Sequence, residues 1–175
     1  MRTHAIRFGA VCLLFLEATG AAACEAVADG ATGSPLLTRK PVRSEEARLT
    51  SGFGLRRHPI LGTAKVHTGI DWAVPSGTPV LAAAGGRVVF AGVQGEFGTT
   101  VILDHGAGWR TLYANLSSLE VREDDCVAAL AVIGRSGATG LSVGPMLHFE
   151  VQRDGRPIDP MQFPSQDPAP AEEAK

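Results

Sequence analysis

The sequence predicts a mainly β domain, built as an antiparallel barrel or sandwich, and three observations support this fold class. The chain of 175 residues has 21 glycines and 11 prolines but is only 19% charged, which suits a turn-rich β domain better than a helical bundle. Its apolar runs are short and are bounded by glycines. No stretch shows the apolar period of an amphipathic helix.

Six segments are predicted to be strands because short apolar or β-branched runs end there at turn residues. In chain order they are 80–83, 87–91, 99–104, 110–114, 131–134 and 146–152. Turns are expected between them at Gly85-Gly86, Gly95, 106–108 and Gly155. An antiparallel barrel-like or sandwich domain follows from this pattern.

The first 23 residues have the features of an export signal. Arg2 and Arg7 make a positively charged region, and the apolar run after them is about nine residues long, too short to span a bilayer of roughly 30 Å. Small residues at 19–23 resemble a cleavage site. We therefore expect a signal peptide at 1–23 and an exported protein, either periplasmic or extracellular.

Three further segments are expected after the signal. Residues 24–48 are polar, rich in small side chains and without a period, as in a linker. Residues 49–163 contain the predicted strands and form the domain. Residues 164–175 are rich in proline, alanine and acidic side chains and have nothing to bury, so we expect a disordered tail.

Cys24 directly follows the expected cleavage point, and two alternatives remain open for it. It could carry a lipid anchor, although 21–23 lacks the leucine common in bacterial lipoprotein signals. It could instead form a disulfide with Cys126 in an oxidising compartment. A membrane is therefore an expected partner only if Cys24 is lipidated.

Two segments carry the side chains with candidate metal chemistry. His67 and Asp71 lie four residues apart, which alone is a weak signal. In the strand predicted at 146–152, His148 points away from its two apolar neighbours, so it suits either solvent or a metal ion. Two histidines and one carboxylate are the usual ligand count of a zinc ion that keeps an open position.

Around these residues, over about 49–163, the chain resembles the peptidase domains of the M23 family, the lysostaphin/LytM kind. The matching segments are 51–60 (SGFGLRRHPI), 67–71 (HTGID), 77–80 (GTPV), 86–88 (GRV), 113–117 (YANLS) and 139–151 (TGLSVGPMLHFEV). The resemblance implies the mainly β, antiparallel barrel-sandwich-like fold of M23/LytM domains, the duplicated hybrid motif. It also implies that His67, Asp71 and His148 hold a zinc ion (Zn²⁺), and that the family hydrolyses peptide bonds in peptidoglycan stem peptides or cross-bridges.

Two histidines that assist proton transfer in the family are replaced in this chain, by Asn115 and Met146. An amide hydrogen-bonds but does not accept a proton near neutral pH, and a thioether has no acid–base chemistry. Glu150 lies about 7 Å from His148 by strand rise, so we expect it to orient a metal ligand rather than to act as the base. The sequence therefore indicates no catalytic residue beyond the metal ligands.

Two positions in the hairpin before Ile133 also depart from the family pattern. Asp124 and Leu130 stand where the family usually has glycines. Glycine at such positions often permits a positive φ, so we expect these turns to be rebuilt or strained.

Four other residues could approach the site or serve the fold. His58 and His105 are more simply interpreted as surface or turn-stabilising histidines than as additional metal ligands. Trp72 and Trp109 could line a substrate groove or pack in the core, and both alternatives stay open.

Two main functions are compatible with these features, so enzymatic activity is left undecided. The first is a zinc metalloendopeptidase acting on peptidoglycan, impaired by the two replacements. The second is a non-catalytic pseudo-enzyme that binds the cell wall or regulates another cell-wall hydrolase. A purely structural metal is a third possibility. A net charge of −2 and a pI near 6.2 argue against nucleic acid as a partner.

Overall fold

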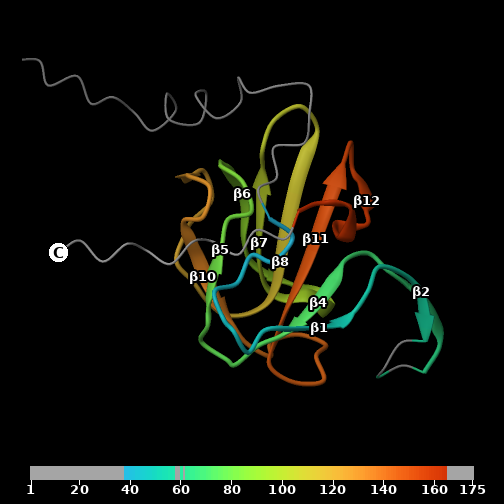
Figure 1. Cartoon of the computed structure of the whole chain (residues 1–175). Coiled ribbons are helices and arrows are strands. Elements are labelled where there is room, and N and C mark those ends of the chain that lie inside the picture. Colours follow the sequence, from blue (N-terminus) through green and yellow to red (C-terminus); the bar gives the residue numbers. More distant parts are fainter. Residues whose placement is uncertain (1–37, 58–59, 61, 165–175) are drawn as a thin grey trace, which may run out of the picture.

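The computed structural model describes residues 38–57, 60 and 62–164, and these residues form an antiparallel β domain (Figure 1). Its strands are β1 (Arg48–Ser51), β2 (Gly54–Arg57), β3 (Ala64–His67), β4 (Ile70–Ala73), β5 (Pro79–Leu81), β6 (Gly86–Gln94), β7 (Gly98–Asp104), β8 (Trp109–Leu119), β9 (Cys126–Val127), β10 (Val132–Ser136), β11 (Met146–Arg153) and β12 (Arg156–Ile158). Two short 3₁₀ turns, η1 (Gly95–Phe97) and η2 (Pro160–Gln162), are the helical elements of the described part. None of its helices has the length and hydropathy needed to cross a membrane. The predicted mainly β, antiparallel fold class is confirmed.

One large sheet of ten strands carries the fold, with the order β1-β4-β11-β8-β7-β6-β9. β10 joins β5 to β8, and β12 pairs with the outer end of β11. All six predicted strands lie in this sheet, as β5, β6, β7, β8, β10 and β11. β2 and β3 form a separate hairpin, which Figure 1 shows beside the main sheet.

The core lies on the inner face of the large sheet and includes both tryptophans. Tyr113 of β8 and Phe149 of β11 are fully buried, and their rings lie 5.4 Å apart at the centre of this face. Trp72 and Trp109 belong to the same buried cluster. Of the two alternatives for the tryptophans, core packing is therefore the one that the structure supports.

The folded unit begins before the expected domain boundary at residue 49. Val42 is buried and bridges to Val80, within the segment expected as a linker. The Arg39 guanidinium donates hydrogen bonds to the carbonyls of Met161 and Phe163 at 3.2 and 2.7 Å. The backbone N–H of Arg39 also donates to Pro164 at 2.9 Å. The two ends of the described domain are therefore held together.

Asp124 and Leu130 both adopt the left-handed conformation expected of glycine. Their φ values are +69° and +64°. The chain has kept the backbone shape of these turns while placing side chains there, so the turns are strained rather than rebuilt.

Several expectations fall on residues outside the described part. The signal peptide at 1–23, nearly all of the tail, Cys24 and His58 belong to this group. Cys126 of β9 is disulfide-bonded, and both other cysteines of the chain lie within residues 1–37. The disulfide alternative for Cys126 therefore has support, while the identity of its partner stays a prediction.

Candidate metal centre

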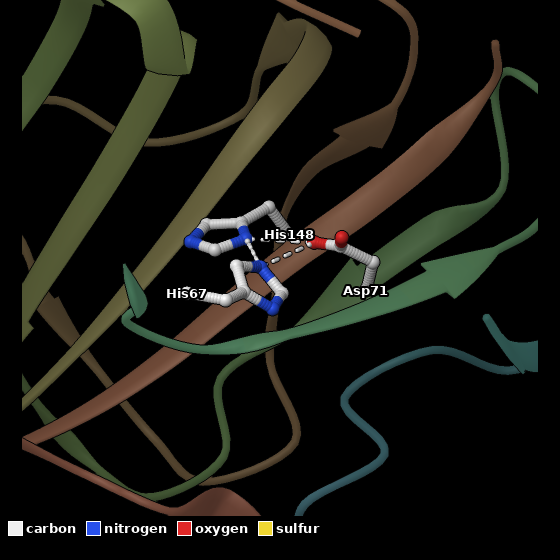
Figure 2. A group of neighbouring side chains, drawn as sticks. All are labelled: His67, Asp71 and His148. Carbon is white, nitrogen blue, oxygen red and sulfur yellow. Dashed lines mark hydrogen bonds and ion pairs between the residues drawn. The ribbon is translucent and has the colours of Figure 1, made fainter. Parts of the chain in front are cut away.

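Strand pairing brings the candidate ligands together from distant parts of the sequence. β11 and β4 are antiparallel neighbours, and in their register His148 lies directly opposite Asp71. Side chains opposite each other in such a pair have Cβ atoms about 4.5–5.5 Å apart, so contact follows from the register. His67 ends β3, and a two-residue turn returns the chain to β4. Figure 2 shows the three side chains pointing toward one another.

The three side chains make a compact and buried group. Asp71 Oδ1 lies 2.8 Å from His148 Nδ1 and 3.1 Å from His67 Nε2, and the two ring nitrogens are 3.2 Å apart. All three residues are less than a tenth exposed. The group has the composition and proximity needed to hold a metal ion.

Each histidine ring has a hydrogen-bond partner on the side away from Asp71. That partner determines which ring nitrogen carries the proton and which has a lone pair for a metal ion. His67 Nδ1 donates to the carbonyl of Gly52 at 2.7 Å, which leaves Nε2 of the neutral ring as an acceptor. His148 Nε2 lies 3.2 Å from Glu150 Oε1 and can donate to it, which leaves Nδ1 as an acceptor. Two nitrogen lone pairs and a carboxylate oxygen then meet at one point. That arrangement fits a divalent cation.

Glu150 is the partner that orients His148, as expected from the sequence. It is only 2% exposed, and its Oε1 also accepts a hydrogen bond from the Thr68 hydroxyl. Its Oε2 accepts from the Gln152 amide at 2.9 Å. Burial alone would raise the pKa of Glu150, but the hydrogen bonds from His148 and Thr68 outweigh it and lower the pKa. The carboxylate is therefore held ionised behind the ligand.

Asp71 is likewise held as a carboxylate. Its burial would raise the pKa, yet the interactions of the carboxylate with the neighbouring rings of His148 and His67 outweigh this effect and lower the pKa far below the usual value. Its outer oxygen, Oδ2, lies 3.3 Å from Nη2 of Arg56. An anionic oxygen is thus available to a cation across the neutral pH range.

Gly69 allows the turn between His67 and Asp71 to cross close to β11. A Cβ atom at this position would lie 2.3 Å from the carbonyl oxygen of Phe149 and 3.0 Å from the His148 ring. Any other residue would push the turn away from His148. The glycine of the HTGID segment is therefore required by packing beside the candidate metal ligands.

A pocket opens over the ligand group, and several of its residues were not foreseen from the sequence. It is lined by Arg56, Ile60, Lys65, Val66, His67, Thr68, Asp71, Glu96, Phe97, Asn115, Leu141, Ser142, Val143, Met146 and His148. The ring of Phe97 lies 5.4 Å from that of His148. No local pattern marks Glu96 or Phe97, because η1 approaches the pocket only through the tertiary fold.

Asn115 and Met146, which the family resemblance led us to expect in place of two histidines, both line the pocket. The Asn115 amide Nδ2 donates to the carbonyls of Thr139 and Phe97 at 2.8 and 3.3 Å. Its φ is +60°, a conformation that asparagine tolerates better than most residues. The Asn115 side chain therefore links the backbone segments at Phe97 and Thr139 in the pocket wall, and Met146 contributes an apolar thioether to the same wall.

His105 lies outside the pocket lining and has a structural role, as the simpler interpretation held. It is buried, with Nδ1 2.7 Å from the Gly85 carbonyl and Nε2 2.7 Å from Thr111 Oγ1. Burial lowers its pKa, against the opposing effects of the Gly85 hydrogen bond and the charge of Asp104. The ring is therefore neutral near pH 7.

Comparisons with known proteins identify relatives of this domain. Residues 65–160 match the sequence model of Peptidase family M23. The DD-carboxypeptidase/endopeptidase Mpg of Neisseria meningitidis serogroup B is 47% identical over 114 residues, which are 65% of this chain and 26% of that protein. This chain thus spans about a quarter of the length of that curated relative.

Two solved structures resemble the domain. A zinc-containing peptidase from Vibrio cholerae has 33% identity and a TM-score of 0.68, covering 75% of this chain and 41% of that one. The catalytic domain of lysostaphin from Staphylococcus simulans has 34% identity and a TM-score of 0.61, covering 66% of this chain and 90% of that one. The buried His-Asp-His group and the zinc-containing relative together indicate that the metal is Zn²⁺.

Proposed function

The chain belongs to peptidase family M23, and on this premise we propose that it is an exported zinc endopeptidase domain for peptidoglycan peptides with strongly reduced hydrolysis. His67, Asp71 and His148 are the proposed zinc ligands. Zinc in such a site polarises a carbonyl group and makes water more acidic. The curated relative is named for carboxypeptidase and endopeptidase action, which supports the choice of peptide bonds.

The proposal of slow peptide hydrolysis is supported by the chemistry of two side chains in the pocket wall, Asn115 and Met146. The Asn115 amide is bound to two backbone carbonyls, and Met146 has no proton to exchange. Neither side chain can act as a general acid or base, and general acid–base catalysis typically increases a rate by roughly 10²–10⁴-fold. Among the described residues that line the pocket, Glu96 is the carboxylate other than Asp71, so it is the alternative candidate for a general base. Its Oε2 lies 2.6 Å from Lys65 Nζ.

The test is the release of soluble peptides from purified peptidoglycan by the zinc-loaded protein and two variants. The Asn115→His, Met146→His double variant should release peptides roughly 10²-fold faster than the natural chain, or more. Glu96→Gln in the natural background should change little. A natural chain as fast as the double variant would refute the proposed impairment, and loss of that rate in Glu96→Gln would identify Glu96 as the base.

Three controls accompany this measurement. The double variant must bind zinc at the same stoichiometry as the natural chain, measured by elemental analysis. Its melting temperature must stay close to that of the natural chain, because Asn115 also fastens two loops. His148→Ala should abolish zinc binding and any peptide release, and release that survives this change would reject the proposed site.

The same pocket supports a second candidate function, a non-catalytic module that binds cell-wall peptides or regulates another cell-wall hydrolase. This proposal is supported by the compact ligand group and the pocket, and by Asn115 and Met146 at the positions where the family resemblance led us to expect proton-transfer histidines. This function predicts saturable co-sedimentation with insoluble peptidoglycan and no released peptides from the natural chain. No co-sedimentation would reject it.

A further inference from the structure

Arg56 lies on the face of the β2–β3 hairpin that is turned toward the metal centre. In the register of this hairpin Gly54 is paired with His67 and Arg56 with Lys65, and such partners share a face. The two pairs are two residues apart along each strand, so Arg56 and Lys65 lie on the same side as His67, and all three line the pocket. Arg57 is exposed on the opposite side of β2 and is not among the residues that line the pocket.

The charge of Arg56 is poorly satisfied for a side chain that is largely removed from solvent. The side chain is 27% exposed, and its Nε is buried without an acceptor in the described part of the chain. The hydrogen bond that it makes, from Nη2 to Asp71 Oδ2, is long at 3.3 Å. Lys65, by contrast, forms a close ion pair with Glu96 at 2.6 Å. Because a buried donor without a partner costs stability, Arg56 calls for an explanation other than the stability of the fold.

The two oxygens of the Asp71 carboxylate have different surroundings. Oδ1 lies 2.8 Å from His148 Nδ1 and 3.1 Å from His67 Nε2, and Figure 2 shows these contacts converging on that one oxygen. Oδ2 receives its hydrogen bond from Arg56 instead. One oxygen is thus directed to the candidate metal position, while the guanidinium lies beside the other.

The number of oxygens that Asp71 gives to a metal ion decides whether the centre stays open. A zinc ion that keeps a position for water or substrate has three protein ligands. Binding of Asp71 through both oxygens would add a fourth protein donor atom and occupy the space of that position. An interaction that keeps Oδ2 away from the metal therefore has a chemical consequence.

We propose that Arg56 is a positioning residue that restricts Asp71 to binding through one oxygen, and thereby keeps a coordination position of the zinc ion free. The inference deepens the proposed function, on which it rests, because hydrolysis needs that position. The guanidinium hydrogen-bonds to Oδ2, and its positive charge repels a cation from that side of the carboxylate. The same charge weakens metal binding, so Arg56 favours an open centre at some loss of affinity.

The test uses the protein loaded with Co²⁺ in place of zinc, with imidazole as a probe of the free position. The visible absorption of Co²⁺ changes with its coordination geometry and loses intensity as the coordination number rises. Imidazole in its neutral form is a metal ligand without a charge for Arg56 to attract. We expect Arg56→Met to lose intensity in the visible bands and to bind imidazole about 10- to 100-fold more weakly than the natural chain. It should bind Co²⁺ at least as tightly as the natural chain, because a positive charge has been removed.

Two arginine variants give a matched comparison. Arg57→Met should bind imidazole like the natural chain, because Arg57 lies away from the pocket and donates to the Gly62 carbonyl at 2.9 Å. Arg56→Lys should restore most of the imidazole binding, since lysine keeps a positive charge and a donor beside Oδ2. Imidazole binding to Arg56→Met as tight as to the natural chain would overturn the inference. Loss of Co²⁺ binding by Arg56→Met would also overturn it, because Arg56 would then support the ligand group as a whole.

The Asp71→Asn background separates an effect on Oδ2 from any other effect of Arg56. The amide nitrogen of asparagine is a donor that offers no lone pair to a metal, so this side chain binds through its oxygen alone. Arg56→Met should therefore leave imidazole binding unchanged in this background. An equal weakening with and without Asp71→Asn would contradict the proposed role.

Failure of this inference and failure of the proposed function are distinguishable. If Co²⁺ and imidazole bind equally well to the natural chain and to Arg56→Met, the inference falls and the function stands. If the natural chain binds no metal, or its Co²⁺ form binds no imidazole, the centre is not open and both fall.

Discussion

Replacing Glu150 by glutamine tests how the zinc site is organised. The carboxylate is 2% exposed and accepts hydrogen bonds from His148 Nε2 at 3.2 Å, from Thr68 and from Gln152 at 2.9 Å. Glutamine keeps the shape but removes the charge, and only one of its two end atoms can accept. His148 then loses the anion that fixes its Nε2–H tautomer and increases the basicity of Nδ1.

The expected loss of zinc affinity follows from the known effect of carboxylates that hydrogen-bond to metal-binding histidines. Replacing the carboxylate behind a metal-binding histidine typically costs 10- to 100-fold in metal affinity, which is about 1.4–2.7 kcal/mol. We expect Glu150→Gln to weaken zinc binding by this factor, measured by competition with a chromogenic chelator. The variant should remain folded, with an unchanged far-UV circular dichroism spectrum.

Gln152→Ala is the matched control for this experiment. It removes the contact with Glu150 Oε2 but leaves Oε1 facing His148, so zinc affinity should change by less than about threefold. Equal zinc affinity of Glu150→Gln and the natural chain would refute the argument that Glu150 orients His148. A loss of affinity in Gln152→Ala as large as that in Glu150→Gln would show that the effect is not specific to Oε1.

Three further predictions concern stability. Asp124→Gly should stabilise the domain by about 0.5–1 kcal/mol and raise the melting temperature by about 2–5 °C, because φ is +69° and the side chain is 89% exposed. Tyr113→Phe should cost about 1–3 kcal/mol in urea unfolding, since the buried hydroxyl accepts from the N–H of Ala83 at 2.8 Å. His105→Gln should flatten the decrease in stability below pH 6.5. Burial lowers the pKa of His105 in the folded state, so below pH 6.5 the unfolded chain binds more protons than the folded chain. The free energy of unfolding therefore decreases as the pH decreases, by at most about 1.4 kcal/mol per pH unit.

Each of these expectations has a clear contrary result. A lower melting temperature in Asp124→Gly would mean that the turn at this position is not strained. Full stability of Tyr113→Phe would mean that the Ala83 N–H finds another acceptor. For His105, unfolding in urea at pH 7.0 and 5.5 gives the slope, and identical slopes for variant and natural chain would reject the histidine as its source.

Local sequence pattern was enough to predict the central strands but not the elements around the site. Strands such as β7 and β11 are long, apolar and bounded by glycines, which made them visible. β4 has only four residues, too few for a strand pattern to stand out, and Asp71 is buried there together with its apolar neighbours Ile70 and Trp72. In β2, Leu55 is exposed while Arg56 is half-buried, the reverse of what hydrophobicity suggests.

The ligand group was found through family resemblance and not through geometry. Asp71 and His148 are 77 residues apart and meet only because β4 pairs with β11 in one register. Strand pairing over such a separation leaves no local trace in the sequence. For the same reason the contributions of Arg56 and Glu96 to the pocket required the structure.

The contact between Arg39 and the segment at 161–164 has a consequence for engineering. Because the N–H of Arg39 is 2.9 Å from the Pro164 carbonyl, both ends of the folded unit leave the surface at one place. A domain with adjacent ends can be grafted into a surface loop of a host protein without pulling that loop apart. By the same geometry, a short linker from 164 to 38 should permit circular permutation, with new ends opened at the exposed β-turn around Gly155.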